Sequence, residues 1–416
     1  MNKSLKVVIN VWDIVAFITP CLFFIEFSLI GRLFLPEIIL LVVFLYFFCI
    51  RCKSLFIGPS RNLLILGLIW LLGQIISDIY RQSDIFDSMK GCSNITFLLL
   101  EFSAIYFLLH KSQCRLILFG LGVITGQVLE YLINPNIFAQ GGDYWKFGIA
   151  FPVTFILVMF SCIPGIYRVK LLPAFILAIA AILNFVLEYR SLGGICLITC
   201  IYLIAQRKSE RLNPYKIKSY LYFVLSILLI SIAALKFYGL AAESGLLGGG
   251  AQEKYEIQSK GVFGLLLGGR QESIVSSLAI MDSPIIGHGS WAKDSKYSAM
   301  LPELLEQYGY DKSQAIIYGE ELEGLIPTHS FLFGAWVSAG ILGAIFWFWM
   351  LAFCQKILFQ VNGIKFPLQP LVIFISIYMI WNIFFSPLGA EGRVYAAYFI
   401  VFLFFTQKNY IKKIQI

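Results

Sequence analysis

The chain has 416 residues, of which 59% are hydrophobic and 13% are charged, and its mean hydropathy is +0.81. A soluble domain is roughly half apolar and about one quarter charged, so this composition excludes an ordinary soluble protein and predicts an integral membrane protein with the lipid bilayer as partner. The net charge of +8 comes from Lys and Arg beside apolar segments, which favours a topogenic role over nucleic-acid binding.

Twelve apolar segments approach the length of about 20 residues that a membrane-spanning helix needs. We therefore expect an all-α polytopic membrane protein with about twelve transmembrane helices. The expected division is 1–238 for helices one to nine, 239–328 for one large exterior loop, and 329–416 for helices ten to twelve. The twelve segments are 11–31, 36–51, 62–79, 92–110, 114–134, 147–166, 170–188, 191–206, 219–238, 329–353, 366–386 and 392–407.

The distribution of Lys and Arg predicts the orientation. With a cytoplasmic amino terminus, the cytoplasmic segments carry 19 of these residues and the opposite short loops carry 6. Short cytoplasmic loops are enriched in Lys and Arg, so both termini are expected in the cytoplasm and the segment 239–328 outside.

The exterior segment 239–328 differs from the rest of the chain in composition. It carries 12 acidic and 6 basic residues and no cysteine. Apolar residues at helical spacing predict short helices near 270–282 and 296–308 within it. Because long connections of this kind are usually functional, we expect this segment to contribute to the site.

Three residues expected at the exterior surface of the membrane are the strongest candidates for catalytic residues. His329 follows Pro327-Thr328, and we expect Thr328 to cap a helix whose first turn contains His329. The positive end of that helix disfavours imidazolium, leaving a neutral base. Arg270 begins a loop helix and Arg190 lies in a tight exterior turn. Each has an ordinary alternative alone: His329 as a capping residue, Arg270 as a solvated charge, and Arg190 as a partner of Glu188 or a snorkelling side chain. Together they predict a site.

Acidic residues inside apolar segments form a second group. Asp13, Glu26, Glu101 and Glu130 belong to it, and Glu101 lies in the middle of a predicted helix. Such charges are costly in a membrane unless they are paired or exposed to water. A transporter would use Glu101 as an ion or proton relay, whereas a buried structural pair is the simpler alternative.

Several familiar motifs are missing from the sequence. With three His in the chain, no His/Cys pattern indicates a zinc site, and no nucleotide-binding loop or Asp-x-Asp pair occurs. We therefore expect neither metal nor cofactor. The nine cysteines lie in or beside apolar segments and are expected to be packing residues.

The order of these motifs resembles the family of O-antigen ligases and O-antigen polymerases. The resemblance rests on Gly269-Arg270, the turn Ser283-Pro284-Ile285-Ile286-Gly287-His288-Gly289, Pro327-Thr328-His329-Ser330, and Gly340 with Gly343. The earlier Arg190-Ser191-Leu192-Gly193-Gly194 is similar to the family's Ser-Arg-Gly turn, although the order of its residues departs from it. The match covers roughly 185–350.

The resemblance implies a GT-C-like fold with a periplasmic loop between helices nine and ten, in the bacterial inner membrane. It implies transfer of a glycan from an undecaprenyl-pyrophosphate carrier to an acceptor sugar hydroxyl without metal. His329 would be the base and Arg270 and Arg190 would stabilise the leaving pyrophosphate. The residues expected to bind substrate are Tyr144, Trp145, His288 and Trp291.

The resemblance leaves the acceptor open. Polymerisation of O-antigen or exopolysaccharide repeat units is favoured, because no basic exterior patch indicates docking of a phosphorylated lipid A-core. The first alternative is an O-antigen ligase that transfers the glycan to lipid A-core, and the second is a polysaccharide transporter or flippase. Under the polymerase hypothesis, a protein that regulates chain length is a further expected partner.

Overall fold

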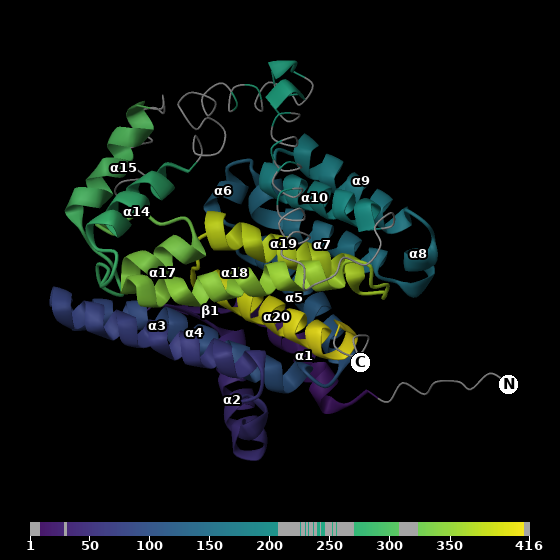
Figure 1. Ribbon diagram of the computed structural model, residues 1–416, viewed down its shortest axis with the longest axis horizontal. Helices are drawn as coiled ribbons and strands as arrows, with labels where there is room; N and C mark the ends of the chain where they lie inside the picture. Colours follow the sequence, from purple (N-terminus) through teal and green to yellow (C-terminus); the bar gives the residue numbers. More distant parts are fainter. Residues whose placement is uncertain are drawn as a thin grey trace.

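A computed structural model describes residues 9–28, 31–206, 270–307 and 323–411, with isolated residues between 225 and 255. This part of the chain is mainly α-helical, with one short β-hairpin near the amino terminus (Figure 1). The predicted helix 219–238 lies largely outside the described residues. The helical class predicted from the sequence is confirmed.

Within the described residues, five helices are long and apolar enough to cross a membrane. They are α2 (Leu35–Arg51) with the 3₁₀ turn that continues it to Ser54, α3 (Pro59–Arg81), α4 (Ile85–Leu109), α5 (Gln113–Ile133) and α18 (Ile341–Val361). Apolar but shorter helices accompany them, which agrees with a membrane protein while the count of twelve spans stays a prediction. The further helices of the apolar part are α1 (Val11–Cys21), α6 (Ile137–Gln140), α7 (Ala150–Ser161), α8 (Pro164–Arg168), α9 (Leu172–Val186), α10 (Arg190–Gln206), α17 (Phe331–Ala339), α19 (Gln369–Phe385) and α20 (Ala390–Thr406).

The prediction of one helix over 11–31 is wrong. Helix α1 ends at Cys21, and the chain continues through a 3₁₀ turn into the antiparallel strands β1 (Glu26–Ser28) and β2 (Arg32–Phe34). The Arg32 guanidinium donates to both carboxylate oxygens of Glu26, at 2.7 and 2.8 Å, across this hairpin. Opposite charges are thereby paired on neighbouring strands, where a continuous helix over 11–31 would have left Glu26 in an apolar segment.

Two further predicted helices are interrupted. The segment 329–353 divides at Gly340, where φ is +61°, a backbone conformation that favours glycine. The segment 147–166 consists of a π-helical turn (Trp145–Ile149), α7 and α8. Pro164 begins α8, because proline lacks the N–H that a continuing helix would need.

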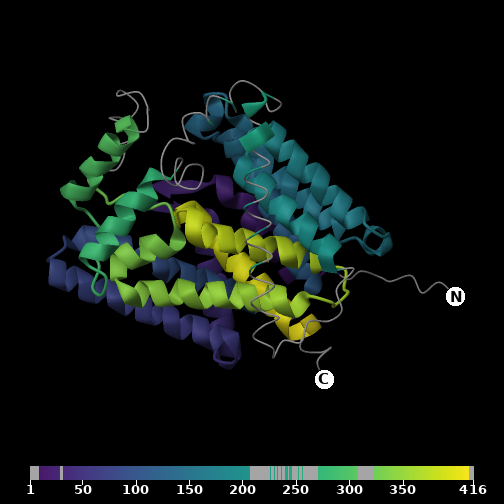
Figure 2. The same ribbon diagram turned by 45° about the horizontal axis from the view of Figure 1, so that its top comes forward.

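Both helices predicted in the polar segment are present, as α14 (Gln271–Asp282) and α15 (Ser295–Gln307). They lie beside α17 at one end of the helix bundle, away from the packed pair α9 and α10 (Figures 1 and 2). A small apolar core, to which Val275, Tyr297, Leu301 and Val337 belong, joins α14 and α15 to α17. This packing places the start of α14 near the start of α17.

Candidate active site

The carboxyl end of α19 anchors the start of α17. The Ser330 hydroxyl donates to the Ile383 carbonyl at 2.7 Å and accepts from the Phe333 N–H at 3.1 Å. Ser330, and not Thr328, is therefore the N-cap, and the expectation that His329 lies in the first helical turn is wrong. Because the Ser330 hydroxyl takes the capping position, His329 lies one residue before the N-cap.

Arg270 reaches the same end of α19 from the polar segment. It is the N-cap residue of α14, and its guanidinium carbon lies 6.0 Å from the ring centroid of Phe385. Burial lowers the pKa of Arg270, but a guanidinium remains charged at any physiological pH. Arg270 and His329 are thus both held against the last residues of α19.

The electrostatic surroundings keep His329 neutral. Burial, then the charges of Arg270 and Lys146, lower the pKa of His329 to about 4. Among the described residues, none forms a hydrogen bond with its ring nitrogens. A neutral imidazole with ring nitrogens available to a ligand can accept a proton from an acidic or hydroxyl group.

Lys146, one of the six Lys and Arg residues predicted in the short exterior loops, lies within electrostatic range of His329. The π-helical turn Trp145–Ile149 carries it, and this turn is anchored by the buried Trp145. The Trp145 indole N–H donates to Asn184 Oδ1 at 3.1 Å, and Asn184 in turn donates to Thr154 Oγ1 at 2.8 Å. Trp145 therefore packs in the core with 8% of its surface exposed, whereas Tyr144 is 48% exposed.

The turn between α9 and α10 brings a third segment to this region. Glu188 has a φ of +60°, which is unusual for a residue with a side chain and marks a sharp reversal. Burial raises the pKa of the next residue, Tyr189, while the charge of Arg270 opposes that shift. Arg190 follows as the half-buried first residue of α10, so the turn carrying Arg190 lies near Arg270.

Glu272 is an acidic neighbour of Arg270 that was not among the residues predicted to form the site. Burial raises the pKa of Glu272, and the Arg270 charge acts in the opposite direction. Its Oε2 atom is buried and has no hydrogen-bond partner among the described residues. In the sequence, the only signal for Glu272 was its position two residues after Arg270, in the first turn of a predicted helix.

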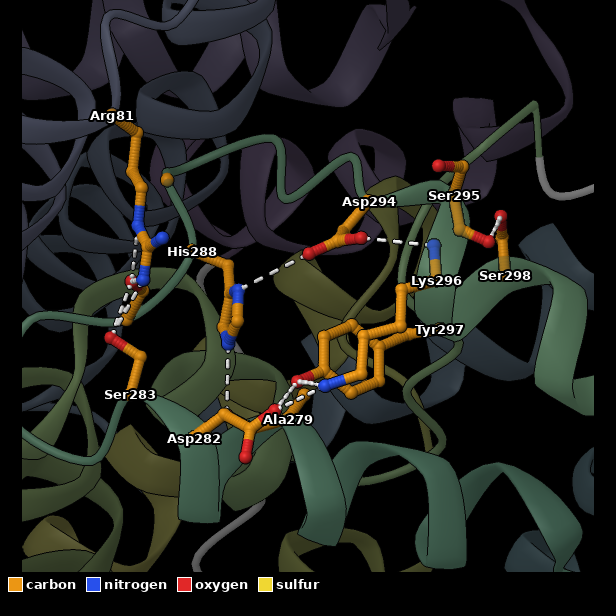
Figure 3. A network of polar contacts seen from close by, with 12 residues as sticks. Arg81, Ala279, Asp282, Ser283, His288, Asp294, Ser295, Lys296, Tyr297 and Ser298 are labelled. Carbon is orange, nitrogen blue, oxygen red and sulfur yellow. Dashed lines mark hydrogen bonds and ion pairs between the residues drawn. The ribbon is translucent and has the colours of Figure 1, made fainter.

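His288 lies in a separate polar network (Figure 3). Its Nε2 donates to the Ala279 carbonyl at 2.8 Å, and its Nδ1 is 3.9 Å from Asp294. Its backbone N–H donates to the Val337 carbonyl at 2.7 Å. Burial lowers the pKa of His288 as well. These contacts join α14, α15 and α17, so they hold the fold around His288 together.

The glycine turn around His288 docks on the end of α3. Arg81 donates to the Gly287 carbonyl at 2.8 and 3.0 Å, and Asp78 accepts from the Ser290 N–H at 2.7 Å. Gly287 and Gly289 have φ values of +87° and +99°, which favour glycine. Trp291 follows the turn, with the Lys90 ammonium 5.6 Å from its ring centroid.

The structure thus brings His329 and Arg270 together with Lys146 and the turn of Arg190, and it places His288 and Trp291 in the docked turn. Among the described residues, no group of three or more His, Cys, Asp or Glu side chains is arranged to hold a metal ion. Comparison with family models, curated proteins and solved structures gave no match. The geometry and chemistry of this cluster are therefore the basis for a functional proposal.

Proposed function

We propose that the chain is a membrane glycosyltransferase that moves a glycan from an undecaprenyl-pyrophosphate carrier to an acceptor sugar hydroxyl on the periplasmic face of the inner membrane. The observation that carries the proposal is the neutral His329, which has the cations Arg270 and Lys146 as electrostatic neighbours, with Arg270 at the end of α19. A base surrounded by fixed positive charge suits a reaction in which a hydroxyl loses a proton and a pyrophosphate leaves.

In the proposed reaction, the acceptor hydroxyl oxygen attacks the anomeric carbon of the carrier-linked sugar. Its proton passes to a ring nitrogen of His329. The bond between the anomeric carbon and the pyrophosphate oxygen breaks, and the electron pair leaves with the lipid pyrophosphate. Arg270 offers a planar pair of donors to that anion, and Lys146 adds a second positive charge.

Arg190 is proposed as a further contact to the leaving group, because the turn that carries it lies near Arg270. Tyr144 is an exposed aromatic residue two positions before Lys146 and is proposed to stack on a sugar ring. His288 and Trp291 are proposed to act only through the position of the docked turn, since His288 is engaged in hydrogen bonds.

The proposal is tested with purified protein in detergent, supplied with lipid-linked repeat units. We expect elongation of the glycan, loss of elongation in Arg270→Gln by about 10²-fold or more, and partial recovery in Arg270→Lys, which keeps the charge but loses the paired donors. A parallel reaction with lipid A-core as acceptor separates polymerase from ligase. Movement of the lipid-linked glycan across a vesicle membrane without any new glycosidic bond would contradict the proposal and favour a flippase.

A further inference from the structure

A second charged cluster lies inside the helix bundle and does not belong to the candidate active site. Glu37 of α2, Glu101 of α4 and Arg393 of α20 meet there. The side chains of both glutamates are 0% exposed and that of Arg393 is 5% exposed. The three residues therefore join three helices through side chains that are buried in this structure.

Donors and acceptors in the cluster are unevenly matched. Glu37 accepts with both oxygens, from Arg393 Nη2 at 2.6 Å and from the Phe34 N–H at 2.7 Å. Glu101 is 3.8 Å from Arg393 Nε, too far for a hydrogen bond, and neither of its oxygens has a hydrogen-bond partner among the described residues. Both carboxyl groups nevertheless lie beside the same guanidinium, Glu37 at 2.6 Å and Glu101 at 3.8 Å from its nitrogen atoms.

Two ionised carboxylates beside one guanidinium would repel each other and could form no hydrogen bond between them. A single guanidinium would also leave one buried negative charge uncompensated, which is costly inside a protein or membrane. A hydrogen atom on one carboxyl removes both problems. Because both oxygens of Glu37 already accept from N–H groups, Glu101 is the residue left to carry that hydrogen.

We propose that Glu101 is a proton-binding site, and that its carboxylic O–H donates a hydrogen bond to Glu37 while the Glu37 carboxylate pairs with Arg393. A metal cation does not fit, because Arg393 already places a positive charge in the cluster and Glu101 alone has uncommitted oxygens. With the proton bound, the cluster is neutral and links α2, α4 and α20.

The neighbouring charges leave this balance unchanged. The guanidinium carbon of Arg393 lies 5.0 Å from the ring centroid of Phe97. The Arg32 side chain is engaged by Glu26 and Glu391 at the surface, and only its carbonyl oxygen contacts Arg393, at 3.5 Å. No charge from the hairpin therefore replaces the proton on Glu101, and the inference does not depend on the proposed glycan transfer.

The test is infrared difference spectroscopy of the purified full-length protein at neutral pH, in water and in deuterium oxide. Subtracting the spectrum of E101Q from that of the wild type should reveal the C=O stretch of one protonated carboxylic acid, shifted in deuterium oxide. E101Q is expected to fold, because its amide can donate to Glu37 as the acid does. E391Q, which removes a half-exposed glutamate paired with Arg32, is the matched control and should keep the band.

Three outcomes would overturn the inference. If the difference between the wild type and E101Q is a carboxylate band, Glu101 is ionised. E37Q supplies the second test, since it leaves Glu101 as the only carboxylate beside Arg393 and should abolish the carboxylic acid band by ionising Glu101. A band that persists in E37Q would show that burial alone protonates Glu101, without the shared hydrogen bond. Carboxylate bands that shift with sodium concentration would indicate a bound metal cation in place of the proton.

Discussion

Two histidines, His329 and His288, both lie beside α17, and they differ in what their ring nitrogens contact. His288 donates to a backbone carbonyl and faces Asp294, within a turn clamped to α3 and α17. His329 forms no hydrogen bond with any described residue and has Arg270 and Lys146 as its charged neighbours. Burial lowers the pKa of both, so a shifted pKa alone does not separate a functional histidine from a structural one.

The difference lies in how completely each side chain is satisfied. A polar group that the fold has already paired contributes to stability, because breaking it leaves a buried partner unmatched. A group with uncommitted polar atoms beside fixed charges is arranged for a ligand. By this criterion the site lies at the end of α19, and the glycine turn around His288 serves as its support.

The largest expected effect comes from replacing the two histidines in parallel. His329→Gln should lower turnover by about 10²- to 10⁴-fold, because it removes the proposed base. His288→Gln should reduce the folded yield while leaving turnover per folded molecule close to that of the wild type. The measurement is glycan transfer normalised to folded protein, determined by size-exclusion chromatography. Equal losses of turnover in both variants would contradict the assignment of His329 as the base and of His288 as a structural residue.

The next effect concerns the supporting turn. Gly340→Ala should destabilise the protein by more than about 1 kcal/mol, because φ is +61° and the added Cβ would meet the Ile285 carbonyl. Gly389→Ala is the matched control, since no atom lies within 4 Å of its Cβ position. Denaturant unfolding in detergent compares the two variants. A Gly340→Ala protein as stable as the control would show that the turn does not pack tightly against α17.

The pH dependence of transfer tests the electrostatics around His329. The proposed base must be neutral, so kcat/KM should fall as the pH decreases through about 4, the pKa of His329. The positive charge of Lys146 disfavours imidazolium, and Lys146→Gln should therefore raise that pKa and move the acid limb to higher pH. Lys90→Gln, which alters a cation beside Trp291 in the docked turn, is the control and should leave the limb in place. If the acid limb of kcat/KM is unchanged in Lys146→Gln, the charge of Lys146 does not act on His329.

Regular elements were the most predictable part of this structure. The predicted helices 62–79, 114–134 and 191–206 correspond to α3, α5 and α10, since long apolar runs have few alternatives in a membrane. The hairpin after Cys21 and the break at Gly340 were missed, because each depends on a contact with a distant segment, through Glu391 and Ile285 respectively.

The candidate site was predictable only where residue type and order carried a signal. His329 and Arg270 were selected from such a pattern, and the structure places both at the end of α19. Lys146 was not selected, since its position depends on Trp145 and Asn184 meeting across two helices. The substrate-binding role expected for Trp145 rested on its residue type, which does not reveal that its ring is buried.

The smallest expected effect is at the surface of the docked turn, where charge pairing looks strong but should contribute little. Lys293 lies 2.8 Å from Asp87, with 44% of its side chain exposed. Exposed pairs of this kind are worth about 0–1 kcal/mol, so Lys293→Met should change stability by no more than that, and salt should reduce the difference further. Asp78→Ala offers the comparison, since Asp78 is buried and its loss leaves the Ser290 N–H unpaired at about 1–3 kcal/mol. If the two variants lose equal stability, the surface charges hold the turn as strongly as its buried hydrogen bonds do. The turn would then no longer contrast with the His329 cluster as a region stabilised by buried, paired polar groups.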